Sequence, residues 1–185
     1  MMDWLGKMLS LPEEFLFSSG GDGGGVIQGT ASEATLVTML AARSQALTKL
    51  NSSSQESTKS LDKLVAYCST QSHSSVERAS LLAAVTIRGL EPDEDLSLRG
   101  STLLEAIKSD RAKGLIPFYV VATLGTTNSC AFDNITEIGK ICEYKTLSLS
   151  SSSSSSQHHF RFHDNIFSLY LFLSFYFTLS RITLI

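Results

Sequence analysis

A glycine-rich segment that runs directly into small hydroxyl residues is the part of this sequence best suited to bind a ligand. Three glycines at 23–25 precede an apolar pair at 26–27, and Gly29-Thr30-Ala31-Ser32 then opens a helix-forming run. Glycine lets backbone N–H groups approach a ligand closely, and a helix start adds unpaired donors and a positive dipole end. The segment predicts a phosphate-binding turn, although a glycine cluster alone is also typical of a flexible turn.

Two further polar positions follow apolar runs. His73 comes shortly after the run at 64–68, and Thr126-Thr127 follows the run at 115–124. Compact apolar runs of this length indicate buried parallel strands, and ligands bind where such strands end. Together with Thr30-Ala31-Ser32, these residues are predicted to outline one site. Helix capping and turn formation are the simpler roles for each residue taken alone.

The intervening segments show the periodicity of helices and strands. Thr30 with Glu33 and Ser74 with Glu77 each fit a capping box, so helices are predicted to begin at about Thr30 and just after His73. The predicted helices cover residues 3–11, 31–50, a segment from 74, 101–112 and 135–144, and the predicted strands cover 26–27, 64–68, 85–87 and 115–124. This alternation predicts an α/β fold with a parallel sheet.

Composition limits the class of protein. The chain has 185 residues and a net charge of −3 with no long basic block, so nucleic-acid binding is not predicted. Cys68, Cys130 and Cys142 form no CxxC pair, which favours free thiols in a reducing, cytoplasmic compartment. The N-terminus lacks the basic and apolar regions of a secretory signal.

The sequence changes character after residue 144. Residues 145–165 read as a Ser/His-rich, low-complexity linker with a serine run at 150–156, and residues 166–185 read as a hydrophobic tail outside the fold. We weigh a marginal membrane anchor, an aggregation-prone strand and translated noncoding sequence, and favour the last. His159 and His163 are four residues apart, but no further ligands accompany them, and we predict no metal site.

Several long motifs resemble the group II pyridoxal-phosphate-dependent decarboxylases, in particular those that act on aromatic L-amino acids. The matching segments are residues 1–9, which begin Met1-Met2-Asp3-Trp4-Leu5, and residues 23–43, 64–79 and 114–134. The resemblance implies that residues 1–144 are part of the large domain of a fold type I, aspartate aminotransferase-like enzyme. It also implies the cofactor pyridoxal 5′-phosphate (PLP), decarboxylation of an aromatic L-amino acid to its amine, and a homodimer in the intact family.

The resemblance assigns roles residue by residue. Ala31 and Ser32 match positions that bind the cofactor phosphate, with Thr30 adjacent. His73 matches a catalytic histidine that stacks on the pyridine ring and helps to position the substrate on the cofactor. Thr127 matches a threonine of the cofactor site close to the ring.

Two family motifs do not occur in the 185 residues. One is the His-x-Asp-Ala-Ala segment, whose acid binds the pyridinium nitrogen, and the other is the Asn-x-His-Lys segment, which carries the Schiff-base lysine. Lys140 and Lys145 are not credible substitutes, because they fall in or beside the last matching helix. The chain therefore reads as an internal slice of the large domain that is inactive by itself. The alternatives are a non-catalytic module that binds intact decarboxylase subunits, or a tail-anchored membrane protein.

Overall fold

The computed structural model describes residues 1–20, 23–51, 58–145, 148–153, 169–173 and 181–184. The helices are α1 (Met2–Met8), α2 (Ala31–Asn51), α3 (Ser74–Leu82), α4 (Gly100–Ala112) and α5 (Ile135–Lys145), with short 3-10 turns η1 (Glu13–Phe15), η2 (Phe17–Ser19) and η3 (Thr58–Lys63). The strands are β1 (Gly25–Gln28), β2 (Leu64–Ser69), β3 (Thr86–Leu90), β4 (Ile116–Leu124), β5 (Ser148–Ser153), β6 (Leu169–Leu173) and β7 (Arg181–Leu184).

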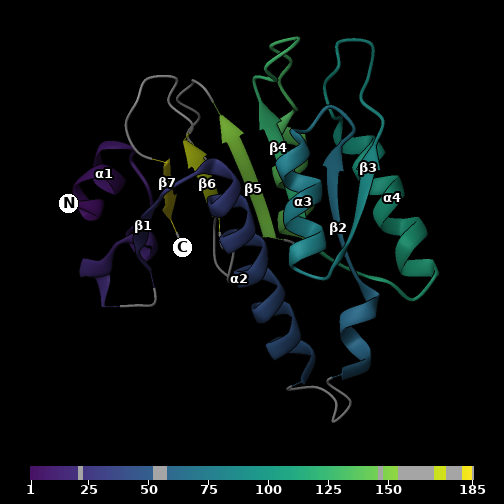
Figure 1. Cartoon of the computed structure of the whole chain (residues 1–185), viewed down its shortest axis with the longest axis horizontal. Coiled ribbons are helices and arrows are strands. Elements are labelled where there is room, and N and C mark those ends of the chain that lie inside the picture. Colours follow the sequence, from purple (N-terminus) through teal and green to yellow (C-terminus); the bar gives the residue numbers. More distant parts are fainter. Residues whose placement is uncertain (21–22, 52–57, 146–147, 154–168, 174–180, 185) are drawn as a thin grey trace.

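The described strands form one sheet in the order β1-β7-β6-β5-β4-β2-β3 (Figure 1). β2 lies between β3 and β4 and is parallel to both, and β4–β5 and β5–β6 are also parallel pairs. β7 pairs antiparallel with β1 and with β6. The predicted α/β fold with a parallel sheet is confirmed. The predicted division into residues 1–144, 145–165 and 166–185 stays a prediction.

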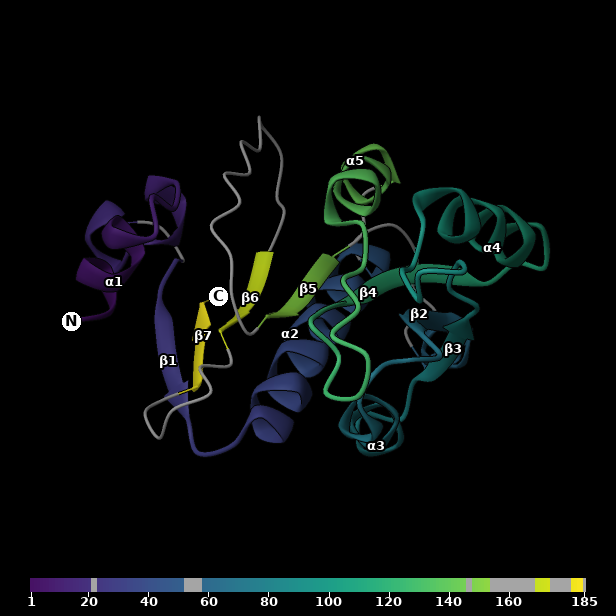
Figure 2. The ribbon, with the colours of Figure 1, turned by 90° about the horizontal axis from the view of Figure 1, so that it is seen from above.

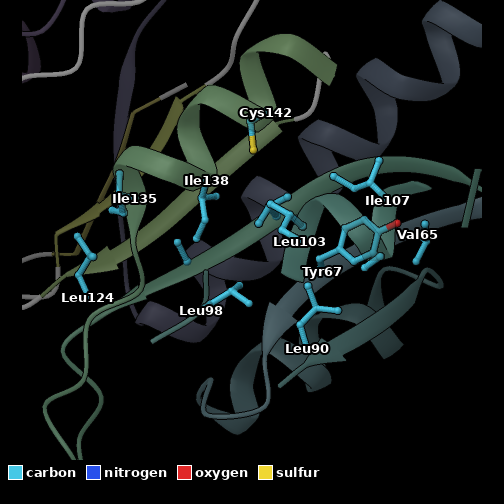
Figure 3. Packing of buried hydrophobic residues seen from close by; sticks show 13 residues of the cluster. Val65, Tyr67, Leu90, Leu98, Leu103, Ile107, Leu124, Ile135, Ile138 and Cys142 are labelled. Atoms are coloured by element: carbon cyan, nitrogen blue, oxygen red, sulfur yellow. The ribbon is translucent and has the colours of Figure 1, made fainter. Parts of the chain in front are cut away.

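Helices cover both faces of the sheet. Figure 2 shows α2 and α3 on one face and α4 and α5 on the other. Every residue of β2 is buried, as expected for a strand covered on both sides. Its side chains alternate between two hydrophobic cores, with Ala66 facing α2 and α3 and Tyr67 facing α4 and α5. In the core formed with α4 and α5, Leu103 and Ile107 of α4 lie near Tyr67, and Ile138 of α5 belongs to the same cluster (Figure 3).

The register between β2 and β4 shifts at one point. Val65 is opposite Pro117, but Ala66 is opposite Tyr119, so Phe118 is the extra residue of a β-bulge. Because of the bulge, Phe118 and Tyr119 both pack in the core beneath α2 and α3. The Tyr119 hydroxyl lies 2.7 Å from the Thr38 hydroxyl of α2, which fixes that helix against the sheet.

Most predicted boundaries agree with the structure to within a few residues, and two details differ. The first helix ends at Met8 rather than residue 11, because Ser10 adopts a positive φ and the Leu11 amide bonds back to the Gly6 carbonyl. The third predicted strand begins at Thr86 and continues to Leu90. Residues 52–57 lie outside the described residues, as do His158, His159 and His163. Among the described helices, none is long and apolar enough to cross a membrane.

Candidate active site

The first predicted cluster forms the start of α2. The Thr30 hydroxyl accepts a hydrogen bond from the Glu33 amide at 3.0 Å, and the Glu33 carboxylate accepts one from the Thr30 amide at 3.1 Å. The predicted capping box is therefore confirmed, and both of these Thr30 groups are engaged within it. The amides of Ala31 and Ser32 and the Ser32 hydroxyl have no acceptor or donor among the described residues. Two free N–H groups at a helix start are well suited to an anion.

The second cluster is His73, which caps α3. Its Nδ1 accepts a hydrogen bond from the Ser75 amide at 3.1 Å and lies 2.9 Å from the Ser75 hydroxyl. The helix begins just after His73, as predicted, but the predicted capping box of Ser74 and Glu77 is wrong, because the histidine side chain supplies the cap. His73 is exposed as a residue, so its side chain is accessible to a ligand.

The third cluster follows β4, and its two threonines differ. The Thr126 hydroxyl accepts a hydrogen bond from the Ala131 amide at 3.1 Å and contacts the Ser129 hydroxyl at 2.5 Å, so it holds the turn together. Thr127 is exposed, and its hydroxyl has no hydrogen bond within the described part of the chain. Of the two, Thr127 is therefore the side chain free to meet a ligand.

The parallel sheet brings these segments to one edge. β2 and β4 are neighbours and run in the same direction, so the residues that follow them emerge at the same edge. The Ser72 hydroxyl lies 3.4 Å from the Thr123 hydroxyl and joins the two strand ends. Figure 1 shows the first turns of α2 and α3 at the edge toward which the arrows of β2 and β4 point.

Asp133 was not predicted from the sequence, and it stabilises the end of β4 next to the candidate site. Its buried carboxylate accepts hydrogen bonds from the Thr123 amide at 2.6 Å and the Leu98 amide at 2.9 Å. Burial raises the pKa of the Asp133 carboxyl above its ordinary value, and the two amide hydrogen bonds oppose that rise. In the sequence, Asp133 is only a carboxylate shortly before α5, a position that indicates a helix cap and no contact with β4.

Comparison with known families identifies the chain. Residues 1–155 match the family described as the pyridoxal-dependent decarboxylase conserved domain. The chain belongs to the pyridoxal-dependent decarboxylases. Because the matched segment contains the described parts of α1 to α5 and β1 to β5, the family assignment covers all three clusters at the sheet edge.

Individual relatives in this family are similar to most of the chain. Aromatic-L-amino-acid decarboxylase of Manduca sexta is 60% identical over 144 residues, which are 77% of this chain and 28% of that protein. The Mus musculus protein of the same name is 57% identical over 77% of this chain and 30% of its own. The chain thus spans less than a third of the length of these two curated relatives.

Solved structures show the same fold. Catharanthus roseus tryptophan decarboxylase in complex with L-tryptophan superposes with a TM-score of 0.73 at 35% identity, covering 83% of this chain and 32% of that one. Oryza sativa TDC with PLP and tryptamine superposes with a TM-score of 0.72 at 38% identity, covering 82% and 31%. The described sheet and helices therefore have the fold of PLP-dependent, fold type I enzymes.

The free groups at the sheet edge fit the cofactor of this family. PLP carries a phosphate dianion and a flat heteroaromatic ring. The unpaired amides of Ala31 and Ser32 suit the phosphate, the exposed imidazole of His73 suits the ring face, and the Thr127 hydroxyl suits a polar ring substituent. The described residues contain no cluster of His, Cys, Asp and Glu that could hold a metal ion.

Proposed function

We propose that this chain supplies the phosphate and ring-face part of the cofactor site in a PLP-dependent decarboxylase that converts an aromatic L-amino acid to its amine. The observation that carries the proposal is the convergence of unpaired polar groups from three separate segments on one edge of the sheet. The similarity to aromatic-L-amino-acid decarboxylases at 57–60% identity supports the aromatic substrate class.

Each residue has a distinct role in this proposal. The Ala31 and Ser32 amides and the Ser32 hydroxyl bind the phosphate, while Thr30 acts indirectly by capping the helix that aims those amides. His73 stacks on the ring and limits how the substrate is oriented, and Thr127 contacts the ring from the β4 side. When bound, the cofactor ring accepts electrons as the bond to the substrate carboxylate breaks.

The phosphate assignment is tested by a charge placed at the start of α2. In Ser32→Asp the new carboxylate lies in the first helical turn, where it favours the helix but repels a phosphate dianion. We expect PLP to bind at least about tenfold more weakly, which corresponds to about 1.4 kcal/mol. The measurement is the dissociation constant from absorbance titration of the 185-residue chain.

Ser44→Asp is the matched control, because Ser44 is an exposed serine of the same helix more than three turns away. It adds the same charge and should leave PLP binding unchanged. Equal dissociation constants for Ser32→Asp and Ser44→Asp would contradict the phosphate assignment.

We also propose that the 185-residue chain by itself does not carry out the reaction. Neither the His-x-Asp-Ala-Ala nor the Asn-x-His-Lys motif occurs in it, so the pyridinium partner and the cofactor-binding lysine have no counterpart here. Formation of amine and carbon dioxide by the purified, PLP-loaded chain would disprove this. Co-purification with an intact relative, without added activity, would instead favour a non-catalytic module.

The assembly and location are likewise proposals. We propose that the chain takes part in a homodimer, as the family resemblance implies, and that it resides in the cytoplasm. The three cysteines, all free, support a reducing compartment. Sedimentation of the chain alone and mixed with an intact relative tests the first point.

A further inference from the structure

Two polar groups of Ser75 contact the same nitrogen of the His73 ring. The Ser75 amide lies 3.1 Å from His73 Nδ1, and the Ser75 hydroxyl lies 2.9 Å from the same nitrogen. A backbone N–H can only donate, so Nδ1 must be the acceptor. In a neutral imidazole one nitrogen accepts and the other carries the hydrogen, so the hydrogen of His73 lies on Nε2.

We propose that Ser75 is a positioning residue that fixes His73 as the Nε2–H tautomer and thereby turns an N–H donor toward the ligand at the sheet edge. The ligand atom that this arrangement recognises is an acceptor oxygen, such as a carboxylate or phenolate oxygen, and not another donor. The identity of the ligand rests on the proposed function, but the tautomer is a property of the chain without ligand.

The backbone around His73 supports a single orientation of the ring. The Val76 amide donates to the His73 carbonyl at 2.9 Å, and the Ser72 amide donates to the Ser69 carbonyl at 3.0 Å. The Ser72 side chain contacts Thr123 on β4, which ties the preceding residue to the sheet. Ser75 itself is buried, so its hydroxyl is screened from competing water. With both flanking segments held, the contact at Nδ1 fixes the remaining side-chain rotation.

The proposal can be tested by substitutions that remove or keep the Ser75 hydroxyl. Ser75→Ala removes the hydroxyl but keeps the backbone amide, so the imidazole loses one of its two donors and becomes freer to rotate. Ser75→Thr restores the hydroxyl. Ser74→Ala is the matched control, because Ser74 is the exposed first residue of the same helix and the described hydrogen bonds of the His73 ring go to Ser75.

The decisive experiment is a long-range ¹H–¹⁵N correlation spectrum of the uniformly labelled 185-residue chain without cofactor. It is recorded at about pH 8.5, where an ordinary imidazole is neutral. The chain contains 4 histidines, and His73→Asn identifies the signals of His73. We expect the wild type, Ser74→Ala and Ser75→Thr to show Nδ1 without a proton and Nε2 with one. Ser75→Ala keeps the backbone amide as a donor to Nδ1, so it should keep the tautomer but show broadened His73 ring signals from exchange between ring orientations.

A protonated Nδ1 in the neutral wild type would overturn the proposal, and so would a Ser75→Ala spectrum identical to that of the wild type. A second readout is the PLP dissociation constant, which we expect Ser75→Ala to raise about 2- to 10-fold, the range of one net hydrogen bond. If the wild type does not bind PLP at all, the proposed function fails. The tautomer result still stands or falls separately.

Discussion

At the scale of single residues, His73 combines two functions that other side chains can separate. Its Nδ1 caps α3, and we propose that its exposed side chain also contacts the cofactor ring. In His73→Asn the amide oxygen can replace Nδ1 as the cap, whereas His73→Gln places its amide one atom too far out and loses the cap. We expect Asn to preserve the free energy of unfolding and Gln to lower it by about 1 kcal/mol, the typical value of an N-cap.

Cofactor binding is expected to respond differently from stability. Both variants lose the imidazole ring, so both should bind PLP more weakly than the wild type, including the Asn variant of unchanged stability. Chemical denaturation and PLP titration of the same samples provide the two measurements. If His73→Asn retained wild-type PLP affinity, the ring would have no part in binding the cofactor.

The candidate site could be predicted from sequence as far as local patterns and family motifs reach. Thr30 and Glu33 form their capping box because both partners lie within one helical turn. The same pattern at Ser74 and Glu77 failed because His73, one residue earlier, offers an acceptor to the Ser75 amide. Asp133 could not be assigned from sequence, since one of its two amide partners, Leu98, is 35 residues away.

At the scale of elements, the contact between α4 and α5 depends on the absence of a side chain at Gly100. A Cβ there would lie 2.8 Å from Glu137 Cβ and 3.3 Å from the Glu137 carbonyl carbon. The Glu137 carboxylate also accepts hydrogen bonds from the Gly100 amide at 2.9 Å and from Asn134 at 3.1 Å, so it connects the starts of both helices. The close approach is therefore part of a capping arrangement shared by two elements.

Gly100→Ala is expected to push the two helices apart. Overpacking of this kind costs about 1–3 kcal/mol, and the displaced backbone would also stretch the hydrogen bond to Glu137. Ser101→Ala, at the exposed next position of α4, should change stability by less than about 0.5 kcal/mol. Thermal and urea unfolding of the two variants provide the comparison. Equal stability of Gly100→Ala and the wild type would show that α5 moves without cost.

The elements themselves were largely predictable, and the register between them was not. Apolar runs flanked by helical segments predicted β2 and β4 because strands buried on both faces are apolar throughout. That same uniformity hides the bulge at Phe118, since no alternation shows which side chains face which core. As a result, the strand sequence does not show that Phe118 and Tyr119 face the same core, whereas Val120 faces the other.

Across the whole chain, each of the two hydrophobic cores contains one buried thiol. Cys68 lies in the core beneath α2 and α3, and Cys142 lies in the core formed with α4 and α5. Burial raises the pKa of the Cys68 thiol to about 11 and that of Cys142 to about 12, from an ordinary value of 9.0. Both shifts have the same cause, because a thiolate in either core would lose its hydration.

Because both thiol pKa values are raised, we expect the folded chain to lose stability at alkaline pH. Between pH 9.0 and the raised values, the unfolded chain releases thiol protons that the folded chain retains, so the free energy of unfolding falls as pH rises. Each pKa unit corresponds to about 1.4 kcal/mol.

Cys142→Ala removes one of the two thiols. The difference in free energy of unfolding between this variant and the more stable wild type should therefore shrink as pH increases above 9.0. The exposed Cys130→Ser is the control, and urea unfolding from about pH 8 to 11 is the measurement. Parallel pH profiles for Cys142→Ala and the wild type would mean that the Cys142 thiol ionises as easily in the folded chain as in the unfolded one, and that the core between the sheet and α5 admits water.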